Sequence, residues 1–180
     1  LQNTGTIVST GTLSLSGNSS NSGTIEQAAL SNSGTFANNG TIELSGALTN
    51  SGTLTSQANT VITGSGVANS GTLNFIGGAN ANAITGSGTT AFYEDSVNNA
   101  TISQNTVNNY GALENNAALT ANTLSNSGTL NNKASLTVAS ASNTGVINSA
   151  SGNISIISLT NNGTLNLNTA GTFGSTGNTV

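Results

Sequence analysis

A short phrase, Asn-x-Gly-Thr-aliphatic, recurs along the chain and constrains its fold more than any other feature. Most consecutive copies, some of them degenerate, begin about 18 residues apart. Such a period, held along a chain, predicts a solenoid, in which each repeat forms one coil and contacts only its neighbours. The copies begin at Asn3, Asn21, Asn32, Asn50, Asn69, Asn108, Asn126, Asn143 and Asn161.

Two intervals depart from this period. The short one runs from Asn21 to Asn32, but the phrase "NNGTI", counted from Asn39, lies one full period beyond Asn21, which indicates that two sides of one coil carry the phrase. The long one, from Asn69 to Asn108, divides into a regular and a longer part if "GSGTT" at Gly86 is a degenerate copy. We therefore expect one longer, irregular coil around residues 86–107.

Short alternations of apolar and polar residues, such as "GTLSLSG", "GTIELSG" and "GTLNLN", follow several copies. Alternation with a period of two is typical of β-strands, whereas Gly, Asn and Thr are unfavourable inside helices. The sequence therefore predicts an all-β fold, a single right-handed parallel β-helix (β-solenoid) over residues 1–180, with about nine or ten coils of 17–22 residues. A disordered Asn-rich tract and a β-sandwich are the alternatives. Regular aliphatic spacing argues against the first, and the recurring corner phrase argues against the second.

A corner that recurs at the same position in every coil would explain the phrase. A corner residue commonly needs a positive φ, which Gly adopts freely and Asn tolerates. We expect the Thr to point outward, the next aliphatic residue to point into the core, and aligned Asn side chains to form amide ladders along the axis. The apolar residues expected to stack above one another are Leu13, Ile25, Phe36, Ile42, Leu54, Leu73, Leu113, Leu130, Ile147 and Leu165.

The chain is almost uncharged, and this excludes several functions. Asn, Thr, Ser and Gly make up about 60% of the residues, and charged residues only 3%. One cationic side chain, Lys133, cannot neutralise a phosphate backbone, so we expect no nucleic-acid partner. No apolar run reaches the eighteen or so residues of a membrane helix, so we expect no membrane insertion.

The composition also offers little for catalysis. With no His or Cys, neither a Ser-His-Asp nor a Cys-His arrangement can form. Lys133 stands apart from any acidic cluster in the sequence. We therefore expect that the protein is not an enzyme and has no catalytic residue, no cofactor and no metal site.

One segment is the best candidate for a specialised contact. Phe92, Tyr93, Glu94 and Asp95 include two of the six aromatic residues and the only adjacent carboxylates of the chain. An overlong coil of a solenoid usually bulges on one side and carries recognition, so we expect a partner-contact loop here. The alternative is a core Phe with a Tyr at the rim and two solvated carboxylates. Neighbours on a strand point to opposite faces, which argues against a shared cation.

The pattern L-x-N-x-G-T-L, followed by an alternating strand such as "LSLSG" or "LNLN", resembles the repeats of filamentous-haemagglutinin-like exoproteins and the β-helical passenger domains of autotransporter adhesins. The likeness covers nearly the whole chain, most clearly in "LQNTGTI", "LSNSGTF", "LTNSGTL", "LSNSGTL" and "LTNNGTL". It implies a right-handed parallel β-helix on the outside of bacteria that serves as an adhesin, fibre or stalk. The chain carries less charge than such passengers, which leaves its attachment partner open.

We therefore expect an adhesin shaft or fibre-forming subunit at the cell surface or outside the cell. Neither "LQNTGTIVST" nor "GTFGSTGNTV" resembles a cap, so the expected partners are further coils, through end-to-end self-association or continuation into a longer rod. A host surface or a glycan is a further candidate partner. The alternative function is a surface-binding module that orders ice or a glycan on a flat Thr/Ser/Asn face. The mixture of Thr, Ser, Asn and Glu at outward positions argues against it.

Overall fold

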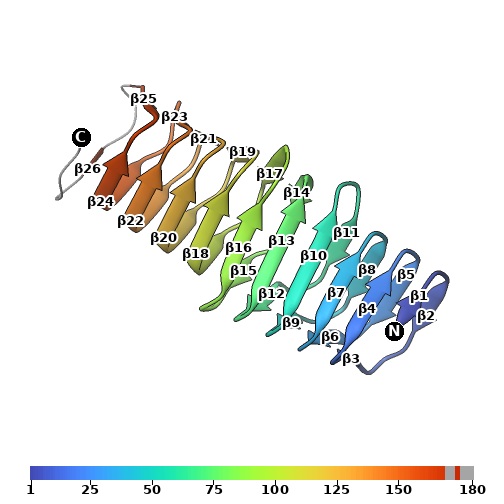
Figure 1. Ribbon diagram of the computed structural model, residues 1–180. Helices are drawn as coiled ribbons and strands as arrows, with labels where there is room; N and C mark the ends of the chain where they lie inside the picture. The colour runs from blue at the N-terminus through green and yellow to red at the C-terminus, as the bar shows by residue number, and fades with distance from the viewer. Residues whose placement is uncertain (169–172, 175–180) are drawn as a thin grey trace.

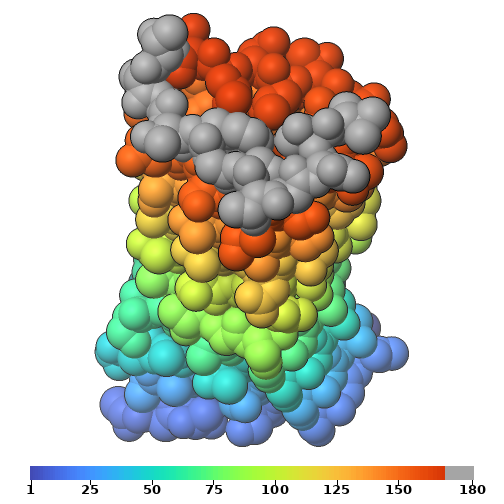
Figure 2. Space-filling view, turned by 90° about the vertical axis from the view of Figure 1, so that its left-hand side faces the viewer, coloured from blue at the N-terminus to red at the C-terminus, as the bar shows by residue number. Residues whose placement is uncertain are grey.

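The computed structural model describes residues 1–168 and 173–174, and these contain strands and no helix. Parallel sheets stack into a right-handed β-solenoid of about ten turns, which confirms the predicted fold class (Figure 1). In the space-filling view, the coils lie above one another as successive bands of colour from blue to orange (Figure 2). Each coil turns three corners and so has three faces.

Face 1 comes first in each coil, and its strands pair in parallel along the whole stack. It comprises β1 (Gln2–Asn3), β4 (Asn18–Asn21), β7 (Thr35–Asn38), β10 (Thr53–Gln57), β13 (Thr72–Ile76), β16 (Thr89–Phe92) and the second halves of β18 (Ile102–Asn109), β20 (Leu119–Asn126), β22 (Leu136–Asn143) and β24 (Ile154–Asn161).

Face 2 follows and consists of two separate sheets. The first contains β2 (Thr6–Val8), β5 (Thr24–Gln27), β8 (Thr41–Leu44) and β11 (Val61–Thr63). The second contains β14 (Gly78–Asn80), β17 (Ser96–Asn98), β19 (Ala112–Asn115), β21 (Thr129–Asn132), β23 (Val146–Ser149) and β25 (Thr164–Leu167).

Face 3 completes the coil and leads back to face 1. It comprises β3 (Thr12–Leu15), β6 (Ala29–Asn32), β9 (Leu48–Asn50), β12 (Val67–Asn69), β15 (Ile84–Thr85), the first halves of β18, β20, β22 and β24, and β26 (Phe173–Gly174). We name the corners by the faces they join: corner 1/2, corner 2/3 and corner 3/1.

One hydrophobic core fills the interior of the solenoid. Its longest column lies on face 3, where inward residues pair in register from coil to coil, and it was not predicted. Aliphatic side chains stacked at the strand spacing of about 4.8 Å exclude water along the whole axis. The column contains Leu13, Leu30, Leu48, Val67, Ile84, Ile102, Leu119, Leu136 and Ile154.

The ten apolar residues that follow the phrase all face the core, but they do not form one column. Eight are buried, and Leu13 and Leu165 pack partly buried against the same cluster. Phe36, Leu54 and Leu73 lie on face 1. Leu13 lies on face 3, and the remaining residues lie on face 2. The prediction of a single stack is wrong because the phrase occurs at corners 1/2 and 3/1, while the Gly-Thr that precedes Leu13 lies at corner 2/3.

The corner glycines are needed for close approach rather than for positive φ. Among the described residues, positive φ occurs only at Asn59, Gly66, Gly77, Gly78 and Gly86, none of which is the Gly of an intact copy. A Cβ placed on Gly128 would lie 2.0 Å from the carbonyl oxygen of Gly111 in the preceding coil. The predicted left-handed corner is therefore wrong. The missing side chain instead lets neighbouring coils stack at strand spacing.

The register also corrects the start of two copies. Asn38, rather than Asn39, pairs with Asn21. Asn109, rather than Asn108, pairs with Asn126. In both cases the buried Asn of an Asn-Asn pair continues the column, because the next residue on a strand points to the opposite side.

The longer coil expected around residues 86–107 is not found there. Thr89 pairs with Thr106, and Thr106 pairs with Thr123 at the same spacing, so this coil is regular. The long interval between the copies at Asn69 and Asn108 arises because the first lies at corner 3/1, whereas the second lies at corner 1/2. The irregular part lies earlier, at residues 57–86, where the two sheets of face 2 meet without pairing and all the positive-φ residues gather. We call this part the seam.

Candidate functional site

The part of the chain that the structure describes holds no group of three metal-ligating His, Cys, Asp or Glu side chains. Within the same residues, no helix is long and apolar enough to cross a membrane. Three parts of the molecule are candidates for a site: the predicted contact loop, the buried polar columns and the outward columns.

The predicted contact loop separates into a core residue and surface residues. Phe92 is fully buried and stacks on Phe75 of the preceding coil, with ring centroids 5.2 Å apart and planes at 10°. Tyr93, the next residue, is 45% exposed. The observed arrangement is a core Phe with a rim Tyr, which is one of the two alternatives that the sequence left open.

Glu94 and Asp95 are both exposed at the start of face 2. Their backbone carbonyls are engaged, since Ser96 Oγ donates to the Glu94 oxygen at 3.0 Å and the Gly78 amide to the Asp95 oxygen at 3.1 Å. No third acidic side chain joins them to form a metal-binding group in the described coils. The two carboxylates are solvated surface groups.

Tyr110 is a surface residue that the sequence interpretation missed. It occupies the position of Tyr93 one coil later, and the two rings stack with centroids 4.9 Å apart and planes at 24°. Both tyrosines of the chain therefore stand together at corner 1/2. The signal was present in the spacing, because the separation of Tyr93 and Tyr110 along the chain equals one coil of this section.

Lys133 forms an ion pair with a single carboxylate, although it stands apart from any acidic cluster of the described residues, as expected. Its Nζ lies 2.8 Å from Glu114 Oε1; Lys133 directly follows β21, and Glu114 lies on the neighbouring strand β19. Hydrogen bonds from Lys133 and then from Asn116 hold the pKa of the Glu114 carboxyl below its ordinary value. The pair is partly exposed and neutralises the cationic side chain of the chain.

Buried asparagines form amide ladders along the corners, as predicted. Within a ladder, each amide nitrogen except the last donates to the side-chain oxygen of the next Asn at 2.7 or 2.8 Å, and several also donate to backbone carbonyls, which satisfies most of these buried polar groups. The ladders are Asn3–Asn21–Asn38 and Asn109–Asn126–Asn143–Asn161 at corner 1/2, Asn32–Asn50–Asn69 at corner 3/1, and Asn80–Asn98–Asn115–Asn132 at corner 2/3.

The ladder at corner 2/3 was not predicted, because its members lack the Gly-Thr of the phrase. Asn115 follows the inward Leu113 by two residues, and Asn132 follows Leu130 in the same way. The shorter pattern Leu-x-Asn, without the rest of the phrase, marks these two members, whereas Asn80 and Asn98 follow Gly78 and Ser96 and carry no such signal.

Gln104 closes the ladder at corner 3/1 across a gap. The position after Asn69 in this column is Gly86, which has no side chain. The longer Gln104 side chain reaches over that coil, and Asn69 Nδ2 donates to Gln104 Oε1 at 2.7 Å. Its own amide nitrogen faces the Gly86 carbonyl at 3.3 Å. The Gln104 side chain is one methylene longer than that of Asn, so its amide takes the place of the Asn that is missing at Gly86.

The outward columns carry hydroxyl and amide groups. On face 1, one column consists of threonines in six successive coils, so the expected mixture of residue types is wrong for this column. Asn side chains also form exposed ladders, as between Asn131 and Asn148 at 2.8 Å on face 2. The threonine column contains Thr35, Thr53, Thr72, Thr89, Thr106 and Thr123.

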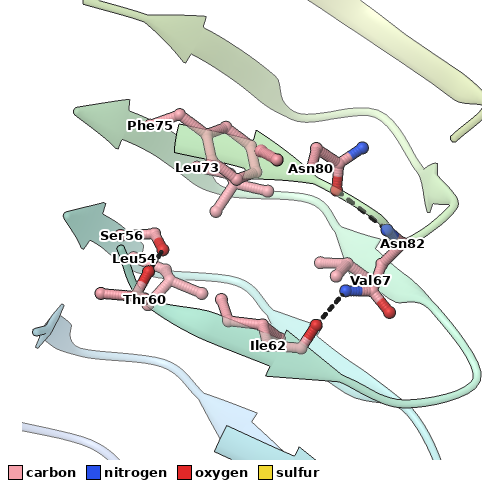
Figure 3. A pocket seen from close by; sticks show the side chains of 10 residues that line it. Leu54, Ser56, Thr60, Ile62, Val67, Leu73, Phe75, Asn80 and Asn82 are labelled. Carbon is pink, nitrogen blue, oxygen red and sulfur yellow. Dashed lines mark hydrogen bonds between the residues drawn. The ribbon is translucent and has the colours of Figure 1, made fainter. Parts of the chain in front are cut away.

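The seam encloses a small internal cavity of about 20 Å³ (Figure 3). Leu54, Leu73 and Phe75 point into it, and Ser56 and Thr60 hydrogen-bond to each other at 2.6 Å on its wall. This volume suits about one water molecule, whereas a ligand pocket needs about 300 Å³ or more. The cavity is a packing defect at the junction of the two sheets of face 2.

Comparison of the chain with protein-family models, with curated proteins and with solved structures found no match. The function therefore has to be argued from the columns and corners themselves.

Proposed function

We propose that the chain is a structural segment of an extracellular or cell-surface protein, an adhesin shaft or fibre-forming subunit built from stacked coils. The observation that carries this proposal is the register, which runs from Leu13 to Ile154 on face 3 without a break. Each coil presents nearly the same columns to the next, so a rod of this kind grows along one axis by adding coils.

The same observation defines the partners of the proposed rod. They are further coils, reached through end-to-end self-association or by continuation of one chain into a longer rod. The proposed role is mechanical, since the rod offers an uncharged hydroxyl and amide surface and needs neither a catalytic residue nor a cofactor. The repeat pattern shared with bacterial surface exoproteins supports a location outside the cell.

The location is tested by immunogold electron microscopy of the producing cells with antibodies against the chain. We expect label on intact cells, along projections from their surface. Label that appears only after permeabilisation would contradict the proposal.

The rod itself is tested by negative-stain electron microscopy of the purified chain over a range of concentrations. We expect narrow rods of constant width. Length that grows with concentration identifies a fibre subunit, and constant length identifies a shaft segment. Compact round particles would contradict both. Gly128→Ala should abolish the rods, and Gly17→Ala should retain them, because a Cβ at Gly17 has no atom within 4 Å.

The threonine column favours a second function, a surface that orders ice or a glycan. Its hydroxyls repeat at the strand spacing of about 4.8 Å over six coils of face 1. Thermal hysteresis and glycan-array binding of the chain test it. Thr89→Lys should abolish either activity, whereas Thr137→Lys, on the exposed column of face 3, should not. Absence of both activities in the unaltered chain would reject this function.

A further inference from the structure

The two tyrosines form the single aromatic feature on the described surface. Tyr93 is 45% and Tyr110 47% exposed, and their rings stack on each other at corner 1/2. Phe92, which precedes Tyr93, and Phe75 of the preceding coil take the ladder positions that Asn occupies in most other coils, whereas Asn109 precedes Tyr110. The buried Phe stack therefore lies inside Tyr93 and the coil before it.

Only one face of each tyrosine ring is covered by the other. Along the corner, Ile76 precedes Tyr93, and Ser127 follows Tyr110, as the pairing of Phe75, Phe92, Asn109 and Asn126 requires. The uncovered face of Tyr110 is therefore directed along the axis toward the coil of Ser127. Ser127 is much smaller than Tyr, so the side-chain size steps down from Tyr110 to Ser127 along the corner.

The neighbours on this side are polar. Thr144 continues the corner after Ser127, and both residues carry hydroxyl groups. The next position along the chain is Gly128 in one coil and Gly145 in the following coil, and at each of them the space that a Cβ would take is filled by backbone of the preceding coil. We name Tyr110, Ser127 and Thr144, with these glycines, the Tyr110 step.

We propose that the Tyr110 step binds a pyranose ring of a neutral glycan. The electron-rich face of an aromatic ring attracts positively polarised groups, and the C–H bonds on one face of a pyranose are such groups. The Thr144 hydroxyl donates to and accepts from the sugar hydroxyls at the edge of the ring, and the Ser127 hydroxyl, which donates to the Asn109 carbonyl at 3.5 Å, accepts from them. Aromatic stacking and hydroxyl groups thus meet at one place.

The charges nearby select neutral sugars over acidic ones. Glu94 and Asp95 are exposed next to Tyr93, and the chain has a formal net charge of −4. Its single cationic side chain, Lys133, already pairs with Glu114 at 2.8 Å. A uronate or sulfate would find no free cationic side chain here and would be repelled by the carboxylates.

A protein partner fits this surface less well than a sugar. A stable protein interface buries about 800 Å² on each side around an apolar core. The tyrosine pair is bordered by glycines and small hydroxyl residues, which provide little apolar area. A single sugar ring matches both the size and the polarity of the step.

Tyrosine fluorescence gives a direct test, because the chain has two Tyr and no Trp. The full chain is titrated with maltohexaose, cellohexaose and N-acetylchitohexaose, and with oligogalacturonate as the acidic probe. We expect saturable binding of at least one neutral probe and none of the acidic one. Tyr110→Ala should weaken binding about tenfold, whereas Tyr110→Phe should stay within about twofold, because the ring face is retained.

Ile157→Ala is the matched control, since Ile157 is 59% exposed on a regular coil away from corner 1/2. It should leave binding unchanged, and every variant should keep the β-sheet circular dichroism spectrum. Failure of all neutral probes to bind, or binding that Tyr110→Ala leaves intact, overturns the proposal. So does Tyr-dependent self-association without sugar binding, measured by sedimentation. The rod function is tested separately, by labelling and microscopy, so either proposal can fail alone.

Discussion

The coils before and after the seam place their buried Asn ladders at different corners. In the N-terminal section (residues 1–56), the buried amides stand at corners 1/2 and 3/1, and three short strands form each coil. In the C-terminal section (residues 87–168), they stand at corners 1/2 and 2/3. There, the eight-residue strands β20, β22 and β24 run from face 3 into face 1 with no buried amide at the junction.

The difference shows what the amides are for. At a sharp corner, the Asn side chain adds hydrogen bonds to backbone carbonyls, as Asn126 does for the Gly128 and Val146 carbonyls. The Gly128 carbonyl also accepts from the Val146 amide, so backbone pairing continues through this corner and the Asn reinforces it. Where one long strand passes from face 3 into face 1, small or aliphatic residues such as Ala121 and Val138 fill the column instead. The buried Asn side chains therefore stand at corners where the chain turns between separate strands.

The change of corner leaves visible defects. Asn109 Oδ1 is buried without a hydrogen-bond partner, because Phe92 occupies the ladder position in the preceding coil. Gln27 Nε2, at corner 2/3 of the N-terminal section, is also buried and unpaired, since its neighbour in the column is Leu44. Such groups cost stability, which places the weak points of the rod where ladders start, stop or are replaced.

The largest effect is expected from closing a glycine corner in either section. The new Cβ of Gly52→Ala or Gly128→Ala would lie 2.0 Å from a glycine carbonyl oxygen of the preceding coil, so the coils would have to separate. We expect each variant to lose about 4 kcal/mol or more, or to fail to fold, in guanidinium unfolding followed by circular dichroism. Gly17→Ala should change stability by less than about 0.5 kcal/mol. A mild effect at only one of the two corners would show that the sections differ in rigidity.

Removal of one buried amide should cost the same in both sections. Asn50 and Asn126 each donate to the next Asn, to a corner glycine carbonyl and to a carbonyl of the following coil. Asn50→Ala and Asn126→Ala should each lower the free energy of unfolding by about 3 kcal/mol, because several buried groups lose partners. The exposed rung Asn148→Ala should cost less than about 1 kcal/mol. Unequal losses at Asn50 and Asn126 would contradict the equivalence of the sections.

An intermediate effect is expected at the bridge between the sections. Gln104→Ala gives this position the residue that its register partner, Ala121, already has, but leaves the Asn69 amide without its partner. We expect a loss of about 2 kcal/mol and faster hydrogen exchange of the Asn69 side-chain amide in NMR spectra. Gln2 is an exposed glutamine of the first coil, so Gln2→Ala should leave the free energy of unfolding unchanged. If Gln104→Ala leaves the free energy of unfolding unchanged, the hydrogen bond between Gln104 and Asn69 does not stabilise the seam.

The smallest effect concerns the ion pair of the C-terminal section. Because its pKa is lowered in the folded state, ionised Glu114 stabilises the fold at neutral pH, and this contribution disappears as the pH falls through the lowered pKa. Glu114→Gln should melt slightly below the unaltered chain at neutral pH, and at the same temperature once the pH lies below the lowered pKa. A melting difference that persists at low pH would assign the effect to packing rather than charge.

Local patterns were enough to predict much of this molecule. Strand alternation and the period of about 18 residues identify the all-β solenoid, the inward side of residues such as Leu54 and Leu130, and the existence of amide ladders. The alternation depends on neighbours within a few positions along the chain, and the period depends on the length of one coil. The placement of Phe92 in the core and Tyr93 at the rim follows from the same alternation.

The tertiary structure alone decided which corner each copy of the phrase occupies. The same five residues turn corner 3/1 at Asn50 and corner 1/2 at Asn126, so the phrase itself does not distinguish them. The corner depends on the register between coils, which is set by packing across the core and by backbone pairing over a whole turn. The seam, the Gln104 bridge and the Tyr110 step all follow from that register, and for this reason the local pattern did not reveal them.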